Sequence, residues 1–116
     1  MQITVTANGQ SQTATLTNNK SAQAFYQLVS QKDITSKMSD YGNFEKVGAL
    51  GQKIARSDKD ITTKPGDIIL YQGDKVTIYY NQNSWNFTLL GHIDGATKQS
   101  MQFFLGKGDV SVTFSK

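Results

Sequence analysis

The sequence predicts a mainly β fold: a closed, mostly antiparallel β-barrel with two or three short helices. Apolar and polar residues alternate in several short runs, which is the pattern of half-buried strands. Turn signals such as Asn8-Gly9 separate the runs and favour hairpins over crossover connections. Closure of the sheet leaves no free edge, which suits strands this apolar. The 116 residues correspond to one domain, residues 1–116, which can bury a core without disulfides or metal ions.

Composition excludes several classes of function. The chain has no cysteine, so disulfides, cysteine-based zinc sites and thiol catalysis are excluded. The net charge of +3 comes from scattered lysines rather than a basic stripe, so we expect no nucleic-acid partner. No apolar stretch is long enough to span a membrane, so we expect no membrane partner. The first residues already alternate like a strand, and we expect a cytoplasmic protein; a secreted parent that has lost its signal peptide is the alternative.

A hairpin and a helix are the first predicted elements. The strands span residues 2–7 and about 10–16, and Asn8-Gly9 between them favours the positive φ angles of a type I′ turn. Asn18-Asn19 then offers an N-cap for a helix over residues 21–30. That helix is predicted from the residues that share one of its faces at i, i+3, i+4 and i+7, namely Ala22, Phe25, Tyr26 and Val29.

The middle of the chain is harder to interpret. A strand is predicted over residues 33–40, with Ile34, Ser36 and Met38 pointing inward, and a loop follows it. Residues 45–55 are ambiguous, because their apolar residues have helical spacing while two glycines weaken a helix by about 1 kcal/mol each. The next stretch, 57–64, is polar and is expected to be a loop.

The second half of the chain returns to hairpins. Strands are predicted over residues 67–71 and 75–81, followed by a turn at 83–86 and a strand at 87–93. Asp94-Gly95 starts a turn into a short helix that ends near residue 105, and a last strand covers 109–115.

The order of these segments resembles that of the small bacterial cyclophilin-like domain family over nearly the whole chain. The stretches that carry the resemblance are Ser39-Asp40-Tyr41, Phe44-Glu45-Lys46, Pro65-Gly66-Asp67-Ile68 with Tyr71, Ile78-Tyr79-Tyr80, Trp85 and Leu90-Gly91-His92-Ile93. The resemblance implies a cyclophilin-type closed β-barrel. It also suggests a flavodoxin-like protein as an alternative partner, because some family members are fused to flavodoxin-like domains or occur alongside them.

True cyclophilins are peptidyl-prolyl isomerases that place an arginine on a barrel strand beside an apolar proline pocket. This chain holds one arginine, Arg56, in a stretch that is predicted to be a helix end or a loop, and it has no Phe-His-Arg segment. We therefore predict a non-catalytic binding domain for a small molecule or a peptide, with no catalytic residue. A divergent isomerase and a partner domain for a flavodoxin-like protein are the alternatives.

The predicted ligand-binding residues are Tyr41, Glu45, Tyr71, Tyr79 and Trp85. Alternation along residues 75–81 places Tyr79 on the face opposite the core, and aromatic side chains with polar tips suit a ligand surface. Simple sheet packing is the alternative for the aromatic residues, and a residue at a helix start is the alternative for Glu45.

The remaining polar residues point to structure rather than chemistry. Asp67 and Asp74 flank one strand and are expected to cap backbone N–H groups. His92 is the only histidine, so a histidine-based metal site would lack a second imidazole ligand. No phosphate-binding loop is present, because Gly106-Lys107-Gly108 follows a helix instead of preceding one. We therefore expect no cofactor and no metal.

Overall fold

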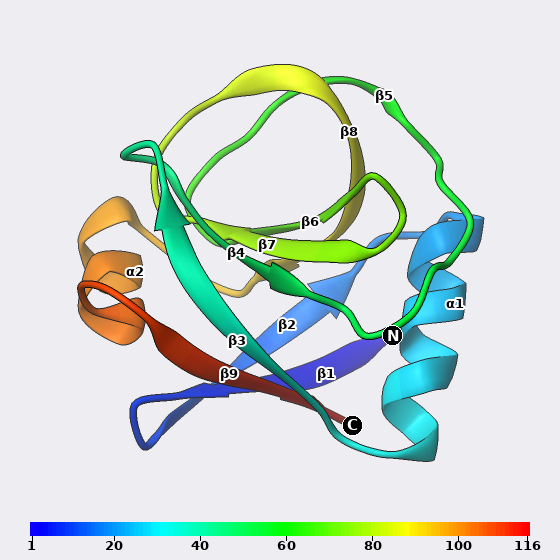
Figure 1. Ribbon diagram of the computed structural model, residues 1–116, viewed down its shortest axis with the longest axis horizontal. Coiled ribbons are helices and arrows are strands. Elements are labelled where there is room, and N and C mark those ends of the chain that lie inside the picture. The colour runs from blue at the N-terminus through cyan, green and yellow to red at the C-terminus, as the bar shows by residue number, and fades with distance from the viewer.

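Eight strands close into an antiparallel barrel in the computed structural model, which describes all 116 residues (Figure 1). These eight strands are β1 Gln2–Ala7, β2 Gln10–Leu16, β3 Ile34–Tyr41, β4 Glu45–Ala49, β6 Asp67–Tyr71, β7 Lys75–Tyr79, β8 Ser84–Ile93 and β9 Val110–Ser115, and a ninth strand, β5 Lys59–Thr62, pairs with β8 alone. Neighbours follow the order β2-β1-β9-β3-β4-β7-β6-β8, and β8 pairs back with β2. This architecture confirms the predicted fold class.

The two helices, α1 Lys20–Gln31 and α2 Lys98–Leu105, lie at opposite sides of the barrel (Figure 1). The backbone N–H of Ala22 donates to the Asn19 side chain, which is the predicted N-cap of α1. Thr97 and Ser100 form a capping box at the start of α2. Neither helix is both long and apolar enough to cross a membrane.

One main hydrophobic core fills the barrel and holds both helices. Phe25 of α1 is fully buried and meets Phe114 of β9 edge to face, with 5.5 Å between ring centroids. Met101 and Phe104 of α2 belong to the same core. Met38 of β3 is also buried, as its alternation predicts.

The structure settles the ambiguous stretch in the middle of the chain and corrects the predicted loop after it. Residues 45–55 contain the strand β4 and no helix, and the predicted polar loop at 57–64 contains the strand β5. Gly48 weakens a helix but fits this strand, because a Cβ atom there would lie 2.7 Å from the Lys37 carbonyl oxygen and closer still to Ser36 Oγ. The glycine therefore permits close packing of β4 against β3 rather than marking a loop.

The predicted turn at 83–86 is also wrong, because β8 already begins at Ser84. The second half of β8 belongs to the barrel, whereas its first half curves away from β6 and β7 and pairs with β5 (Figure 1). We refer to this two-stranded segment, Lys59–Thr62 with residues 84–87, as the ribbon. The ribbon covers part of the outer barrel surface and creates a second, smaller hydrophobic cluster around Ile69, Tyr79 and Phe87.

Candidate functional site

A cleft lies on the outer surface of the barrel, where the wall formed by β4, β6 and β7 meets the ribbon. Register explains which side chains reach it: Glu45 pairs with Tyr79, Val47 with Thr77 and Tyr71 with Lys75, so these side chains share the outward face. The cleft has a volume of about 460 Å³, within the range of small-molecule sites. Its lining is Tyr41, Phe44, Glu45, Val47, Tyr71, Lys75, Asn83, Trp85 and Phe87.

Four of the five predicted site residues line this one cleft: Tyr41, Glu45, Tyr71 and Trp85. The fifth, Tyr79, does not belong to the lining. It lies on the outward face of β7, as alternation predicts, but it is fully buried and does not line the cleft. Phe44 stacks on its ring at 5.8 Å, and Phe87 packs edge to face at 5.7 Å. Tyr79 is therefore part of the layer beneath the cleft.

The rim of the cleft carries two large exposed aromatic side chains. Trp85 is 65% exposed and Tyr41 is 63% exposed, whereas most aromatic side chains of the chain are covered. Tyr41 also meets Phe44 edge to face, at 6.2 Å between ring centroids. Aromatic rings that are fixed at their base and open to solvent on one face can pack against a ligand with little loss of conformational freedom.

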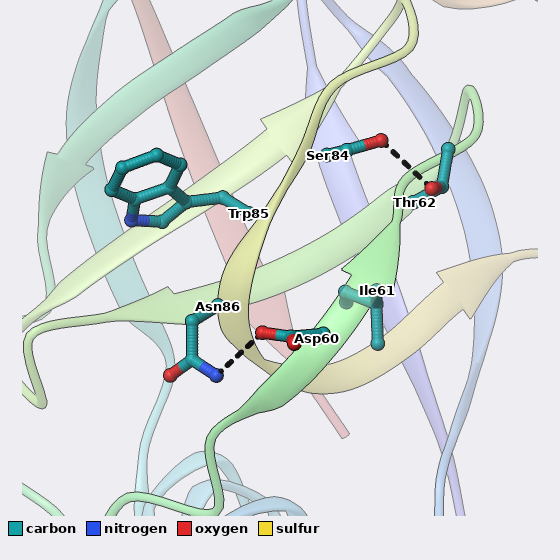
Figure 2. Close-up of a pocket in the computed structure, with 6 residues that line it drawn as sticks. All are labelled: Asp60, Ile61, Thr62, Ser84, Trp85 and Asn86. Carbon is teal, nitrogen blue, oxygen red and sulfur yellow. Dashed lines mark hydrogen bonds between the residues drawn. The ribbon is translucent and has the colours of Figure 1, made fainter.

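The ribbon holds Trp85 in place through polar pairs. Asn86 donates to Asp60 and Thr62 bonds to Ser84, and the indole of Trp85 extends clear of both pairs (Figure 2). A shallow groove of about 540 Å³ runs over these residues. Because its polar groups already satisfy one another, the groove offers a ligand fewer free partners than the cleft does.

Glu45 supplies the one carboxyl group of the cleft lining. Glu45 is only 8% exposed, and burial raises the pKa of its carboxyl; the nearby hydroxyls of Tyr79 and Thr77 offset that rise only in part. The reading of Glu45 as a residue at a helix start is wrong, because it begins the strand β4. No cation pairs with Glu45.

Two buried hydroxyl groups under the cleft, Tyr79 Oη and Thr77 Oγ1, make no hydrogen bond of full geometry, and both lie next to the Glu45 carboxyl. The Tyr79 hydroxyl lies near Asn83, Glu45 and Tyr71, all of which line the cleft. Burial raises the pKa of Tyr79, and the Glu45 carboxylate adds to the rise. Buried polar groups without partners are rare in folded proteins, so each one calls for an explanation.

A second polar cluster, at the edge of the barrel next to α2, is fully satisfied. Lys46 is completely buried and reaches the Asp40 carboxylate at 2.9 Å and the Gly108 carbonyl oxygen. Burial alone raises the pKa of Asp40, but bonds from Lys46, the Gly108 N–H and the Tyr80 hydroxyl outweigh it and hold the pKa below its ordinary value. With every group paired, this cluster fixes the loop before β9 to the barrel.

The other residues singled out from sequence have structural partners. Arg56 lies in the segment between β4 and β5, pairs with Asp58 and does not line the cleft. Asp67 accepts a hydrogen bond from the backbone N–H of Lys64, as predicted for a capping residue, and also contacts His92 Nδ1 at 2.8 Å. No group of three or more His, Asp or Glu side chains is arranged to hold a metal ion.

Sequence reasoning missed five residues of the lining: Phe44, Val47, Lys75, Asn83 and Phe87. Phe44 and Phe87 could have been recognised as cleft residues from their places in the sequence. Phe44 is a large apolar residue in a polar loop directly before Glu45, and Phe87 follows Trp85 by two positions on one strand. For Val47, Lys75 and Asn83 no local pattern distinguishes a cleft residue from an ordinary surface residue.

Closed antiparallel topology, helices at both sides and an aromatic cleft on the outer wall define a cyclophilin-type barrel. Comparison with protein families agrees: the profile described as the Cyclophilin-like family matches residues 5–115. The chain therefore belongs to the cyclophilin-like family. Comparison with curated proteins and with solved structures found no match.

Proposed function

We propose that this chain is a binding domain, and that the cleft between the barrel wall and the ribbon takes a small organic molecule. The observation that carries the proposal is Glu45, a nearly buried carboxyl without a counter-ion, in a cleft lined mostly by apolar side chains. A few fixed polar groups at the base of an apolar cleft are what orients a small ligand in typical binding sites.

Energetics support the same conclusion. Burying a hydroxyl without a partner costs about 1–3 kcal/mol, and burial also disfavours the charge on Glu45. Replacing Tyr79 by phenylalanine would keep its ring stacking with Phe44 and remove the cost of the hydroxyl. The two hydroxyls are covered, so a ligand in the cleft would meet Glu45, the carboxyl of the lining that both hydroxyls adjoin.

The lining favours binding over isomerisation. Cyclophilin isomerases rely on an arginine beside the proline pocket, and Arg56 of this chain is held by Asp58 outside the cleft. A peptide is the second ligand class that fits an aromatic cleft. The volume of about 460 Å³ and the buried polar floor favour a compact molecule, which can place its polar end against Glu45.

Trp85 allows a direct test, because it is the only tryptophan of the chain and lies in the cleft. We expect members of a small-molecule fragment library to change its fluorescence in a saturable way. Affinities of the hits for variants are then measured by calorimetry. Trp85→Ala should weaken binding by about tenfold or more, since an aromatic anchor is removed.

The matched control is Phe103→Ala. Phe103 is also an exposed aromatic residue, at 76%, but it lies on α2 and does not line the cleft. Its removal should leave the affinity of every hit unchanged. A library without hits, or hits that bind Trp85→Ala as tightly as the parent chain, would contradict the proposed function.

A further inference from the structure

We infer that the ligand of the cleft carries an organic ammonium group, which the aromatic side chains surround and the Glu45 carboxylate balances. The inference rests on the proposed function and names the class of ligand.

Glu45 is the only glutamate of the chain. Its side chain is almost fully buried and has no counter-ion. The ion pairs of the protein join Lys46 to Asp40, Arg56 to Asp58, Lys75 to Asp74 and His92 to Asp67. None involves Glu45. A buried carboxyl without a cation is costly to ionise, and a bound cation would remove that cost.

Lys75 is the one cationic side chain in the lining of the cleft. Its ammonium group pairs with its neighbour Asp74 at 3.3 Å, and both side chains are about half exposed. Lys75 therefore does not neutralise Glu45, and the position opposite the carboxyl stays open to a cation that arrives from solution.

The rings of the cleft determine which kind of cation fits. Tyr41, Phe44, Tyr71, Trp85 and Phe87 all line it. Aromatic faces attract cations, and a cage of such rings is suited to alkylated ammonium groups, which shed water more readily than metal ions do. A metal ion would also need several oxygen ligands, and the cleft lining offers one carboxyl group.

The test compares two probes of nearly the same shape, choline and 3,3-dimethylbutan-1-ol, of which only choline is charged. Both are titrated against the full chain at constant ionic strength, and Trp85 fluorescence is the signal. We expect choline to bind at least about tenfold more tightly than the neutral alcohol, because the alcohol keeps the apolar contacts and loses the attraction of the rings and of Glu45.

Two variants assign the preference to its sources. In Glu45→Gln the ratio of the two affinities should fall to within about threefold. The matched control is Asp33→Asn, which removes an exposed carboxylate that does not line the cleft and should leave the ratio unchanged. Tyr41→Leu should weaken choline alone, because leucine retains an apolar surface without a ring face. Tyr41 is exposed, so this variant keeps the fold and the signal of Trp85.

Equal affinity for the two probes, a preference that survives in Glu45→Gln, or failure of choline to bind at all would each overturn the ammonium inference. Equal affinity would leave the proposed function intact, because the cleft would still bind apolar molecules. Failure of the whole fragment library in the earlier experiment is the separate result that would remove the proposed function.

Discussion

The hydroxyl of Tyr79 gives a sharp prediction, because it is buried and makes no hydrogen bond of full geometry. Tyr79→Phe removes the hydroxyl and keeps the ring between Phe44 and Phe87. An unsatisfied buried hydroxyl costs about 1–3 kcal/mol. We expect the variant to gain about 1 kcal/mol in the free energy of unfolding. This value is at the lower end of the range because the Tyr79 hydroxyl interacts with the nearby Glu45 carboxyl, which offsets part of the cost of burying it. For a chain of this length that gain raises Tm by about 4 °C.

Tyr80 provides the matched control, one residue along the chain. Its hydroxyl donates to Asp40 at 3.0 Å, and burial together with Asp40 raises the pKa of Tyr80 to about 12. Tyr80→Phe breaks that bond and should lose about 1 kcal/mol. Two neighbouring Tyr→Phe changes are thus expected to have opposite signs.

The assay is urea unfolding of both variants and the parent chain at one fixed pH, with the slope m checked for constancy. A ligand found in the fluorescence screen is then titrated against Tyr79→Phe, which should bind it more weakly although it is more stable. If Tyr79→Phe loses as much stability as Tyr80→Phe, the Tyr79 hydroxyl makes a full hydrogen bond in solution and its burial carries no net cost.

The remaining predictions concern charge and exposure. Asp40→Asn should lower the free energy of unfolding in urea by about 2–3 kcal/mol, since it leaves the fully buried Lys46 without its counter-ion. Lys46→Met should cost less, because it removes the buried charge itself. Equal losses would show that the uncompensated charge of Lys46 is not the cause. Burial raises the pKa of Glu45 in the folded state. The parent chain therefore loses stability as the pH rises above the pKa that a glutamate has in the unfolded chain, about 4.3. Glu45→Gln should therefore raise Tm at pH 7, and the gain should shrink on acidification to about pH 3.5; a gain independent of pH would show that the charge is not the cause. Trp85→Ala should change the free energy of unfolding by less than about 1 kcal/mol, because the side chain is 65% exposed. A loss of about 3–5 kcal/mol would show instead that Trp85 is buried in the core.

The barrel could be predicted from the sequence because its evidence is local. Turn chemistry at Asn8-Gly9 gives φ angles of 52° and 75° as expected, and α1 extends only one residue beyond the predicted range at each end. β5 could not be predicted in this way. It has a single apolar residue, Ile61, and its strand conformation depends on pairing with β8, which lies more than twenty residues further along the chain.

The cleft could be predicted only in part, for a related reason. Alternation along a strand tells which side of a sheet a residue faces but not what covers that side. Tyr79 faces outward, and the curve of β8 places Phe87 over it. Tyr41, Glu45 and Trp85 do meet in one cleft as predicted, although that prediction came from family resemblance rather than from a pattern in the residues.

Nuclear magnetic resonance measures the central claim most directly, because amide shifts report on every part of the chain at once. ¹⁵N-labelled protein is titrated with the best hit of the fragment library, and the single indole N–H of Trp85 serves as an internal marker. We predict saturable shifts for Trp85, Glu45 and Phe44, with residues of α2 unmoved. Saturable shifts confined to α2 or to the β1–β2 hairpin, with the cleft unaffected, would show that the ligand binds elsewhere and would contradict the account.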